Sequence, residues 1–250
     1  MSIENAFDNL SEEILKPWDI VKKIEYFPET VIVTFDETIS EIVKNQPDAK
    51  IIGEFNAGYK IPIYEITQKD KRIGVYKTLI GSAGTVMLLE EAIAKGAKKF
   101  IFFGSCGTLV KDISVGKFIV PTAAYRDEGT SYHYIPAGDY IEVKTAEKLS
   151  EIMTKLNLPH IKGKTWTTDA IYRETKNNMA KRKSEGCITV DMECSAVMAA
   201  GELRGVEVYQ YLYAEDNLDS DEWERRSMGT VPINSKEKYL LIALDIAVMV

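Results

Sequence analysis

The sequence is poor in the residues that form disulfides and metal sites. Its 250 residues include only three cysteines (Cys106, Cys187 and Cys194) and two histidines (His133 and His160). The cysteines form neither an even disulfide set nor a metal-binding spacing, and the histidines have no ligand-like spacing. We therefore expect no metal, no organic cofactor and a reducing compartment, which favours the cytoplasm.

Basic residues are also scarce. The 31 lysines and arginines are outnumbered by 38 acidic residues, which gives a net charge of −7. No basic stripe stands out to neutralise phosphates, so neither nucleic acid nor an anionic membrane is expected as the main partner. Residues 1–19 contain five acidic residues and no uninterrupted apolar run, which argues against a signal peptide or a membrane anchor. A small-molecule ligand suits this composition better.

The apolar content is sufficient for one sizeable core. A chain of this length with 45% hydrophobic residues is typical of a single α/β domain. We expect a lead-in over residues 1–30, mostly helical as far as residue 24, and one domain over residues 31–250. Strand patterns occur at 31–35, 51–55, 61–67, 73–79, 100–103, 116–126, 162–168, 187–190 and 206–213, and helical patterns at 83–95, 145–156, 192–201 and 234–250.

The stretch from Cys187 to Gly201 organises the prediction of function. A short buried strand is followed by an Ala- and Met-rich helix, so Asp191 and Glu193 lie at the junction between them. Two carboxylates there are costly unless they are paired, and the hydroxyls of a bound sugar would pair with both. The alternative is that Asp191 caps the helix, with Glu193 in the first turn stabilised by the helix dipole.

Two other strand ends carry polar residues. Gly104 to Thr108 is predicted as a small-residue loop whose amides, with the Ser105 hydroxyl, hold an anion or a sugar oxygen. A plain tight turn is the alternative interpretation. Asp216 follows the strand at 206–213 and is expected at the edge of the same crevice, because ligands bind outside the carboxyl ends of such strands.

Four sequence blocks in order resemble the nucleoside phosphorylase and nucleosidase superfamily. They are Ile80-Gly81-Ser82-Ala83-Gly84-Thr85, Phe103-Gly104-Ser105-Cys106-Gly107, Thr189-Val190-Asp191-Met192-Glu193-Cys194-Ser195-Ala196 and Ala214-Glu215-Asp216. The resemblance extends from about Val31 to Val250. It implies a single α/β domain with a central mixed, twisted and partly barrel-like β-sheet flanked by helices. It also implies a homo-oligomer in which a neighbouring subunit completes each active site.

The resemblance also implies roles for individual residues on the sugar side of the site. Glu193 would bind the ribose 2′ and 3′ hydroxyls, and Met192 would pack against the sugar. Asp191 stands where many relatives have glutamate, and Ser105 would face the phosphate or the sugar.

On the base side, Ile171 and Tyr172 would line the base, although Tyr172 also fits a simple core position. Asp216 would be the acid beside N7 of a purine. Its protonation of the base makes physical sense, because the base leaves with negative charge while the sugar becomes oxocarbenium-like.

The chain departs from the phosphorylase pattern where phosphate would bind. Phe102 replaces an arginine of the phosphorylases, and residues 34–39 lack the glycine and arginine of their N-terminal loop. Bidentate contacts from guanidinium groups bind phosphate strongly, so phosphate binding here would need a cation from elsewhere in the protein. Arg126, at a predicted strand end, and Arg72, reaching in from a neighbouring subunit, are the candidates.

The resemblance implies cleavage of the N-glycosidic bond of a nucleoside. The residues that read uracil in uridine phosphorylases fall on Thr175 and Asn177, so a purine is expected. Phosphorolysis, with phosphate as co-substrate and ribose 1-phosphate as product, is preferred because the overall pattern resembles that branch. A hydrolytic nucleosidase is the alternative, since Phe102 and Phe35 would make a drier, less cationic pocket. A nucleoside-binding protein without turnover is the third possibility.

Overall fold

The computed structural model describes residues 2–250, which are organised around one sheet of ten strands. The strands are β1 Thr30–Thr34, β2 Lys50–Asn56, β3 Lys60–Gln68, β4 Lys71–Lys77, β5 Lys99–Thr108, β6 Phe118–Asp127, β7 Tyr140–Glu142, β8 His160–Thr168, β9 Cys187–Asp191 and β10 Glu207–Asn217. The helices are η1 Ile3–Asn5, α1 Pro17–Ile20, α2 Glu37–Lys44, α3 Ser82–Lys95, α4 Ala146–Lys155, η2 Ser131–His133, η3 Ile171–Arg173, α5 Lys176–Ser184, α6 Cys194–Arg204 and α7 Ile233–Met249.

Part of the sheet closes into a ring. The strand order β10-β6-β8-β9-β5 returns to β10, because β5 pairs in parallel with β10 along most of its length. From β5 the sheet continues outward through β1, β4, β3 and β2, of which β2 and β3 are antiparallel to their neighbours and β1 is parallel to β4. The predicted mixed, partly barrel-like sheet is therefore confirmed.

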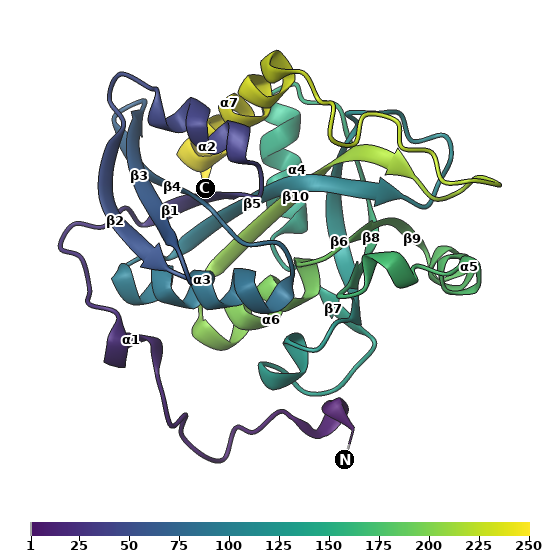
Figure 1. Cartoon of the computed structure of the whole chain (residues 1–250), viewed down its shortest axis with the longest axis horizontal. Helices are drawn as coiled ribbons and strands as arrows, with labels where there is room; N and C mark the ends of the chain where they lie inside the picture. The colour runs from purple at the N-terminus through teal and green to yellow at the C-terminus, as the bar shows by residue number, and fades with distance from the viewer. Residues whose placement is uncertain (1) are drawn as a thin grey trace.

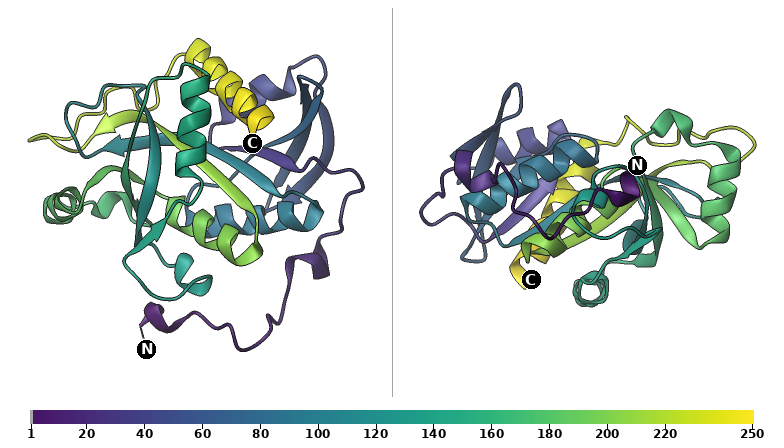
Figure 2. Two further views of the ribbon diagram at one scale, coloured as in Figure 1. Left: turned by 180° about the vertical axis from the view of Figure 1, so that it is seen from behind. Right: turned by 90° about the horizontal axis from the view of Figure 1, so that it is seen from below.

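Helices cover both sides of the sheet. α2, α4 and α7 lie on one side and α3 and α6 on the other (Figures 1 and 2). The central strands are apolar on both faces as a result, and Phe100, Phe102, Tyr209 and Tyr211 are fully buried between the layers. Burying each aromatic ring stabilises the fold by roughly 1.5–3 kcal/mol. Within the described residues, no helix combines the length and the apolar character needed to span a membrane.

Two of the predicted strands are longer than the sequence indicated. β5 continues from the predicted 100–103 through Thr108, so the predicted loop or tight turn at Gly104–Thr108 is wrong. The extension is held by pairing of Gly107 and Thr108 with both β9 and β10. β10 likewise runs to Asn217, which places Asp216 within the strand rather than after it.

The N-terminal lead-in is not mostly helical. Only η1 and α1 are helical before β1, and the segment runs along the outside of the molecule (Figure 1). Leu10 and Ile14 are almost fully exposed, so a helix there would bury no apolar face. Short helices without such packing are marginal in water, which explains the irregular backbone.

Candidate active site

A cavity of about 620 Å³ opens at the carboxyl ends of β5, β9 and β10. Its walls also include η3, the start of α5 and the hairpin that follows β10. Of the residues predicted from the sequence, it brings together Ser105, Ile171, Tyr172, Asp191, Met192, Glu193 and Asp216. Residues far apart in the sequence thus meet in one hollow, of a size typical of small-molecule sites.

Asp191 connects the end of β9 to the start of α6. Its Oδ2 accepts the backbone N–H groups of Glu193 (3.2 Å) and Cys194 (2.7 Å), and its Oδ1 accepts the hydroxyls of Thr165 (3.2 Å) and Thr167 (2.8 Å). Burial raises the pKa of Asp191, and these hydrogen bonds oppose the rise. Both oxygens are occupied by the protein itself, so Asp191 caps the start of α6 from the end of β9, as the helix-cap interpretation described. Glu193, however, is the N-cap residue and not part of the first turn.

Glu193 extends from the same junction into the cavity. It is only 7% exposed, and its Oε1 accepts the backbone N–H of Gly81 at 2.7 Å from the loop before α3. Burial, together with the nearby charge of Asp191, raises the pKa of Glu193 to about 8. Its carboxyl group is therefore held in a fixed orientation and retains a proton near neutral pH.

Asp216 reaches the cavity from a β-bulge in β10. The register shifts between Ala214 and Asp216, so the strand bends here against Gly107 of β5. A Cβ at position 107 would lie 3.2 Å from Oδ1 of Asp216 and 2.7 Å from Leu218, so glycine leaves room for the carboxylate. Burial raises the pKa of Asp216, which suits a group that must donate a proton.

The other predicted residues line the cavity from three sides. Met192 is half-buried beside the two junction acids, and the exposed Ser105 lies on β5. Ile171 and Tyr172 lie on η3, where the Tyr172 side chain is 95% exposed, so it is not a core residue. An exposed aromatic ring at a cavity is available to contact a flat ligand.

Comparison with known proteins places this geometry in a family. A family model described as the phosphorylase superfamily matches residues 29–241. The chain belongs to the phosphorylase superfamily. Among curated relatives, an uncharacterized protein of Acanthamoeba polyphaga mimivirus is 30% identical over 175 residues, which is 68% of each chain. A DeoD-type purine nucleoside phosphorylase of Bacillus cereus is 26% identical over 186 residues, covering 73% of this chain and 78% of the relative.

Solved structures share the fold. Purine nucleoside phosphorylase from Toxoplasma gondii, in complex with immucillin-H, superposes with a TM-score of 0.75 at 22% identity, over 95% of this chain and 97% of that one. AMP nucleosidase from Bacteroides thetaiotaomicron gives a TM-score of 0.71 at 19% identity, over 91% and 90% of the two chains. The chain therefore shares its fold with these proteins over nearly its whole length.

Arg126, predicted as a phosphate ligand, does not line the cavity of this superfamily member. The side chain is only 3% exposed, and its guanidinium donates to the Ser131 hydroxyl (2.8 Å) and to the carbonyl oxygens of Pro136 (2.7 Å) and Gly138 (3.2 Å). These bonds hold the loop after β6 in place. The prediction that Arg126 lies at the site is therefore wrong, because the loop after β6 folds back and binds its guanidinium.

Arg72 lies outside the cavity of its own chain as well. It is on β4, where its guanidinium pairs with Glu65 on β3, with Nε 2.9 Å from Oε2. Phe102 is fully buried in the core, whereas Phe35 does line the cavity and packs against Gly104. Of the two phenylalanines expected to dry the pocket, only Phe35 contacts it.

Three acidic residues at the cavity, Glu174, Glu215 and Asp221, were not predicted as site residues from the sequence. Burial, with the charge of Asp216, raises the pKa of Glu174 to about 7. Burial, with the charges of Asp36 and Asp216, raises that of Glu215 to about 7. Glu174 follows η3 in an irregular segment without periodic pattern. In the sequence, Glu215 stands out only as the neighbour of Asp216. In a regular strand, side chains alternate between the two faces, so Glu215 would point away from the cavity that Asp216 enters.

The cavity is rich in carboxyl groups and poor in cations. Six acids line it, namely Glu174, Asp191, Glu193, Glu215, Asp216 and Asp221. Among the described residues of its lining, Lys176 is the single lysine or arginine, and its Nζ donates to the Asp221 carbonyl oxygen at 3.0 Å. Within residues 2–250, no three His, Cys, Asp or Glu side chains are placed to share a metal ion. The cavity therefore favours neutral or cationic ligands over anionic ones.

Proposed function

We propose that this protein cleaves the N-glycosidic bond of a purine nucleoside. The observation that carries the proposal is that Glu193, from the junction of β9 and α6, and Asp216, from β10, both have raised pKa values and reach the same cavity. Titratable groups perturbed by burial in one cleft are typical of catalytic sites. Membership of the phosphorylase superfamily, and curated relatives named as purine nucleoside phosphorylases, support the same reaction class.

The proposed mechanism divides the work between the sugar and the base. Glu193 binds the ribose hydroxyls, Met192 packs against the sugar, and Ile171 and Tyr172 contact the base. As the glycosidic bond breaks, Asp216 donates its proton to N7 of the leaving purine, which quenches the negative charge that develops there. Carboxylates around the cavity stabilise the positive charge on the sugar.

We propose water as the nucleophile. Its oxygen bonds to C1′ of the sugar, its proton passes to a cavity carboxylate, and the products are free base and free ribose. The surplus of acids over Lys176 supports this assignment, because a phosphate dianion is poorly held without paired guanidinium groups. The same charge disfavours substrates with a 5′-phosphate, so we propose nucleosides rather than nucleotides.

Phosphorolysis is the second candidate, and the names of the curated relatives favour it. It would require a cation from outside the chain's own cavity, and Arg72 of a neighbouring subunit in a homo-oligomer is the candidate for that role. Ser105 and Lys176 are the donors that the chain itself offers. A binding protein without turnover is less well supported, since binding alone does not require a buried acid with a raised pKa.

The test is release of free base from a panel of nucleosides and AMP, in phosphate-free buffer and with added phosphate. We expect purine nucleosides to be cleaved without phosphate, and AMP to be cleaved much more slowly. Cleavage that requires phosphate would replace hydrolysis by phosphorolysis. An absence of base release under both conditions would overturn the proposal.

A further inference from the structure

The general acid of the proposed reaction is held by a tryptophan on the hairpin that follows β10. Nε1 of Trp223 donates to Oδ2 of Asp216 at 2.7 Å, and both residues line the cavity. Resting on the proposed function, we propose that Trp223 is a positioning residue for Asp216. By occupying Oδ2, it directs the transferable proton to Oδ1, the oxygen beside Gly107.

The chemistry of the indole ring makes it suited to this role. Indole N–H is a donor with no acceptor, so a protonated Asp216 cannot pass its own hydrogen to Trp223. A hydroxyl or amide partner would offer an acceptor and compete with the base for that proton. With Oδ2 occupied, the proton resides on Oδ1 and is available to the substrate.

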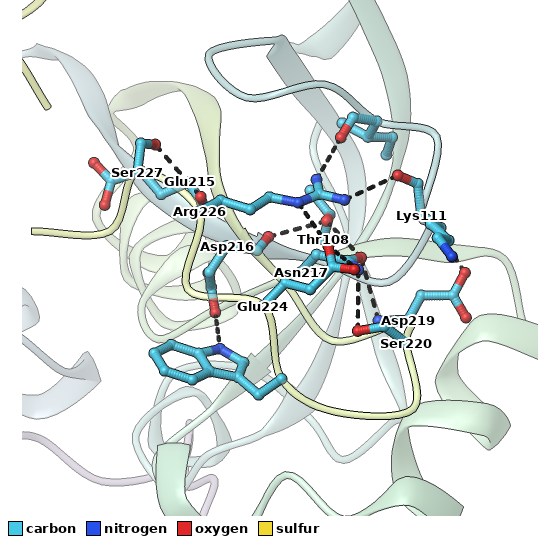
Figure 3. Close-up of polar contacts among 12 residues, drawn as sticks. Thr108, Lys111, Glu215, Asp216, Asn217, Asp219, Ser220, Glu224, Arg226 and Ser227 are labelled. Atoms are coloured by element: carbon cyan, nitrogen blue, oxygen red, sulfur yellow. Dashed lines mark hydrogen bonds and ion pairs between the residues drawn. The ribbon is translucent and has the colours of Figure 1, made fainter. Parts of the chain in front are cut away.

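The hairpin that carries Trp223 is anchored at its base by Asn217 and Glu224 (Figure 3). Their backbones exchange two hydrogen bonds, at 3.0 and 3.1 Å, and Nδ2 of Asn217 donates to Oε2 of Glu224 at 3.1 Å. Asn217 is fully buried, and its Oδ1 accepts the hydroxyl of Thr108 on β5 at 3.1 Å. The base of the hairpin is therefore fixed to the central sheet, and this holds Trp223 close to Asp216.

Arg226 fastens the far side of the hairpin (Figure 3). Its Nε donates to Oε2 of Glu224 at 3.0 Å, and its two terminal nitrogens donate to the carbonyl oxygens of Ile113 (2.7 Å) and Lys111 (3.0 Å). Its φ of +47° lies in the left-handed region, which a non-glycine residue adopts only when its surroundings enforce it. A mobile surface loop would not need this clamp, whereas a loop that positions a catalytic group does.

Several charged or titratable groups besides Trp223 surround Asp216. Glu174 follows η3, Glu215 precedes Asp216 on β10, Cys106 lies on the neighbouring strand β5, and Arg226 follows the hairpin. Burial raises the pKa of Asp216, whereas the Trp223 hydrogen bond and then the charge of Arg226 lower it. Removing the indole donor should therefore raise the pKa of Asp216 further. Because a general acid works in its protonated form, the alkaline limb of the kcat profile should move to higher pH.

The experiment compares Trp223→Phe with the wild-type protein on two substrates, namely the best purine nucleoside of the panel and its N7-methylated form. The methylated base leaves as a neutral molecule and needs no proton. On the parent nucleoside we expect kcat to fall roughly 10–100-fold with little change in KM, because a misoriented acid loses proximity catalysis. On the methylated nucleoside kcat should stay within about twofold of wild type, because no proton transfer is needed.

Trp18→Phe is the matched control, since Trp18 on α1 is 53% exposed and Trp223 is 57% exposed. It should leave kcat and the pH profile unchanged, and melting temperatures verify that both variants are folded. An unchanged kcat and pH profile in Trp223→Phe would overturn the inference, as would equal losses on both substrates, which would indicate a purely structural role. If the wild type releases base from neither substrate, the proposed function itself fails.

Discussion

The carboxylate of Asp191 holds the backbone of Glu193, the residue whose side chain faces the cavity. Oδ2 of Asp191 accepts the Glu193 N–H at 3.2 Å while Oδ1 ties the junction to Thr165 and Thr167 on β8. One acid therefore fixes the start of α6 so that the other is presented to a ligand. The two carboxylates predicted from one sequence motif have different physical tasks.

Removal of the Asp191 carboxylate should mainly affect stability. Asp191→Ala leaves the N–H groups of Glu193 and Cys194 without their acceptor, and we expect the free energy of unfolding to fall by about 1–3 kcal/mol. Urea denaturation measures the loss. The exposed Asp112 is the control, and Asp112→Ala should change stability by less than about 0.5 kcal/mol. Equal stability of the two variants would contradict the cap assignment.

Glu193→Gln should weaken substrate binding and slow turnover while leaving the fold intact. A sugar hydroxyl that loses its carboxyl partner costs about 1–3 kcal/mol of transition-state stabilisation, which is read from kcat/KM. Steady-state kinetics that match wild type, in a variant with a normal melting curve, would show that Glu193 does not bind the ribose.

The same substitution should change how stability depends on pH. The pKa of Glu193 is raised by burial from its ordinary value of 4.5 to about 8, so the folded state binds this proton more tightly than the unfolded state. The resulting stabilisation is complete below the unfolded pKa and is lost as pH rises through the folded pKa. Melting temperatures of the wild type should therefore decline between about pH 5 and 8 more steeply than those of Glu193→Gln. Parallel curves for the two proteins would contradict the raised pKa.

Asp216→Asn removes the proposed general acid. We expect kcat on an unmodified purine nucleoside to fall about 10²–10⁴-fold, the usual contribution of positioned proton transfer. The N7-methylated nucleoside should be nearly unaffected, because its base needs no proton to leave. If both substrates lose the same factor, another residue is the proton donor.

The two arginines predicted as phosphate ligands should differ in how much they contribute to stability. Arg126→Ala would leave the carbonyl oxygens of Pro136 and Gly138 without donors and should lower the free energy of unfolding by at least about 2 kcal/mol. Arg72→Ala removes only an exposed pair with Glu65 and should cost about 0–1 kcal/mol. Thermal unfolding compares them. A sharp rise in phosphate KM with Arg72→Ala would instead support phosphorolysis with a neighbouring subunit.

The sequence predicted the parts of the site that depend on local pattern. The change from strand to helix around Asp191 is visible in the switch of apolar periodicity, and the structure has β9 and α6 there. The strand at Gly104–Thr108 was not predicted, because a run of small residues is typical of a turn. Its pairing with β9 and β10 joins segments far apart in the sequence, which local pattern does not show. Trp223 and Glu174 reach the cavity on irregular segments, whose paths are set by clamps such as Arg226 rather than by any periodic signal.

The most direct test of the account is the identity and amount of product formed from one purine nucleoside in phosphate-free buffer, by the wild type and by a Glu193→Gln, Asp216→Asn double variant. The account predicts equal amounts of free base and free ribose from the wild type, and almost none from a double variant that still melts cooperatively. No base from the wild type even after phosphate is added, or equal release by the double variant, would contradict the assignment of this cavity as a site of glycosidic bond cleavage.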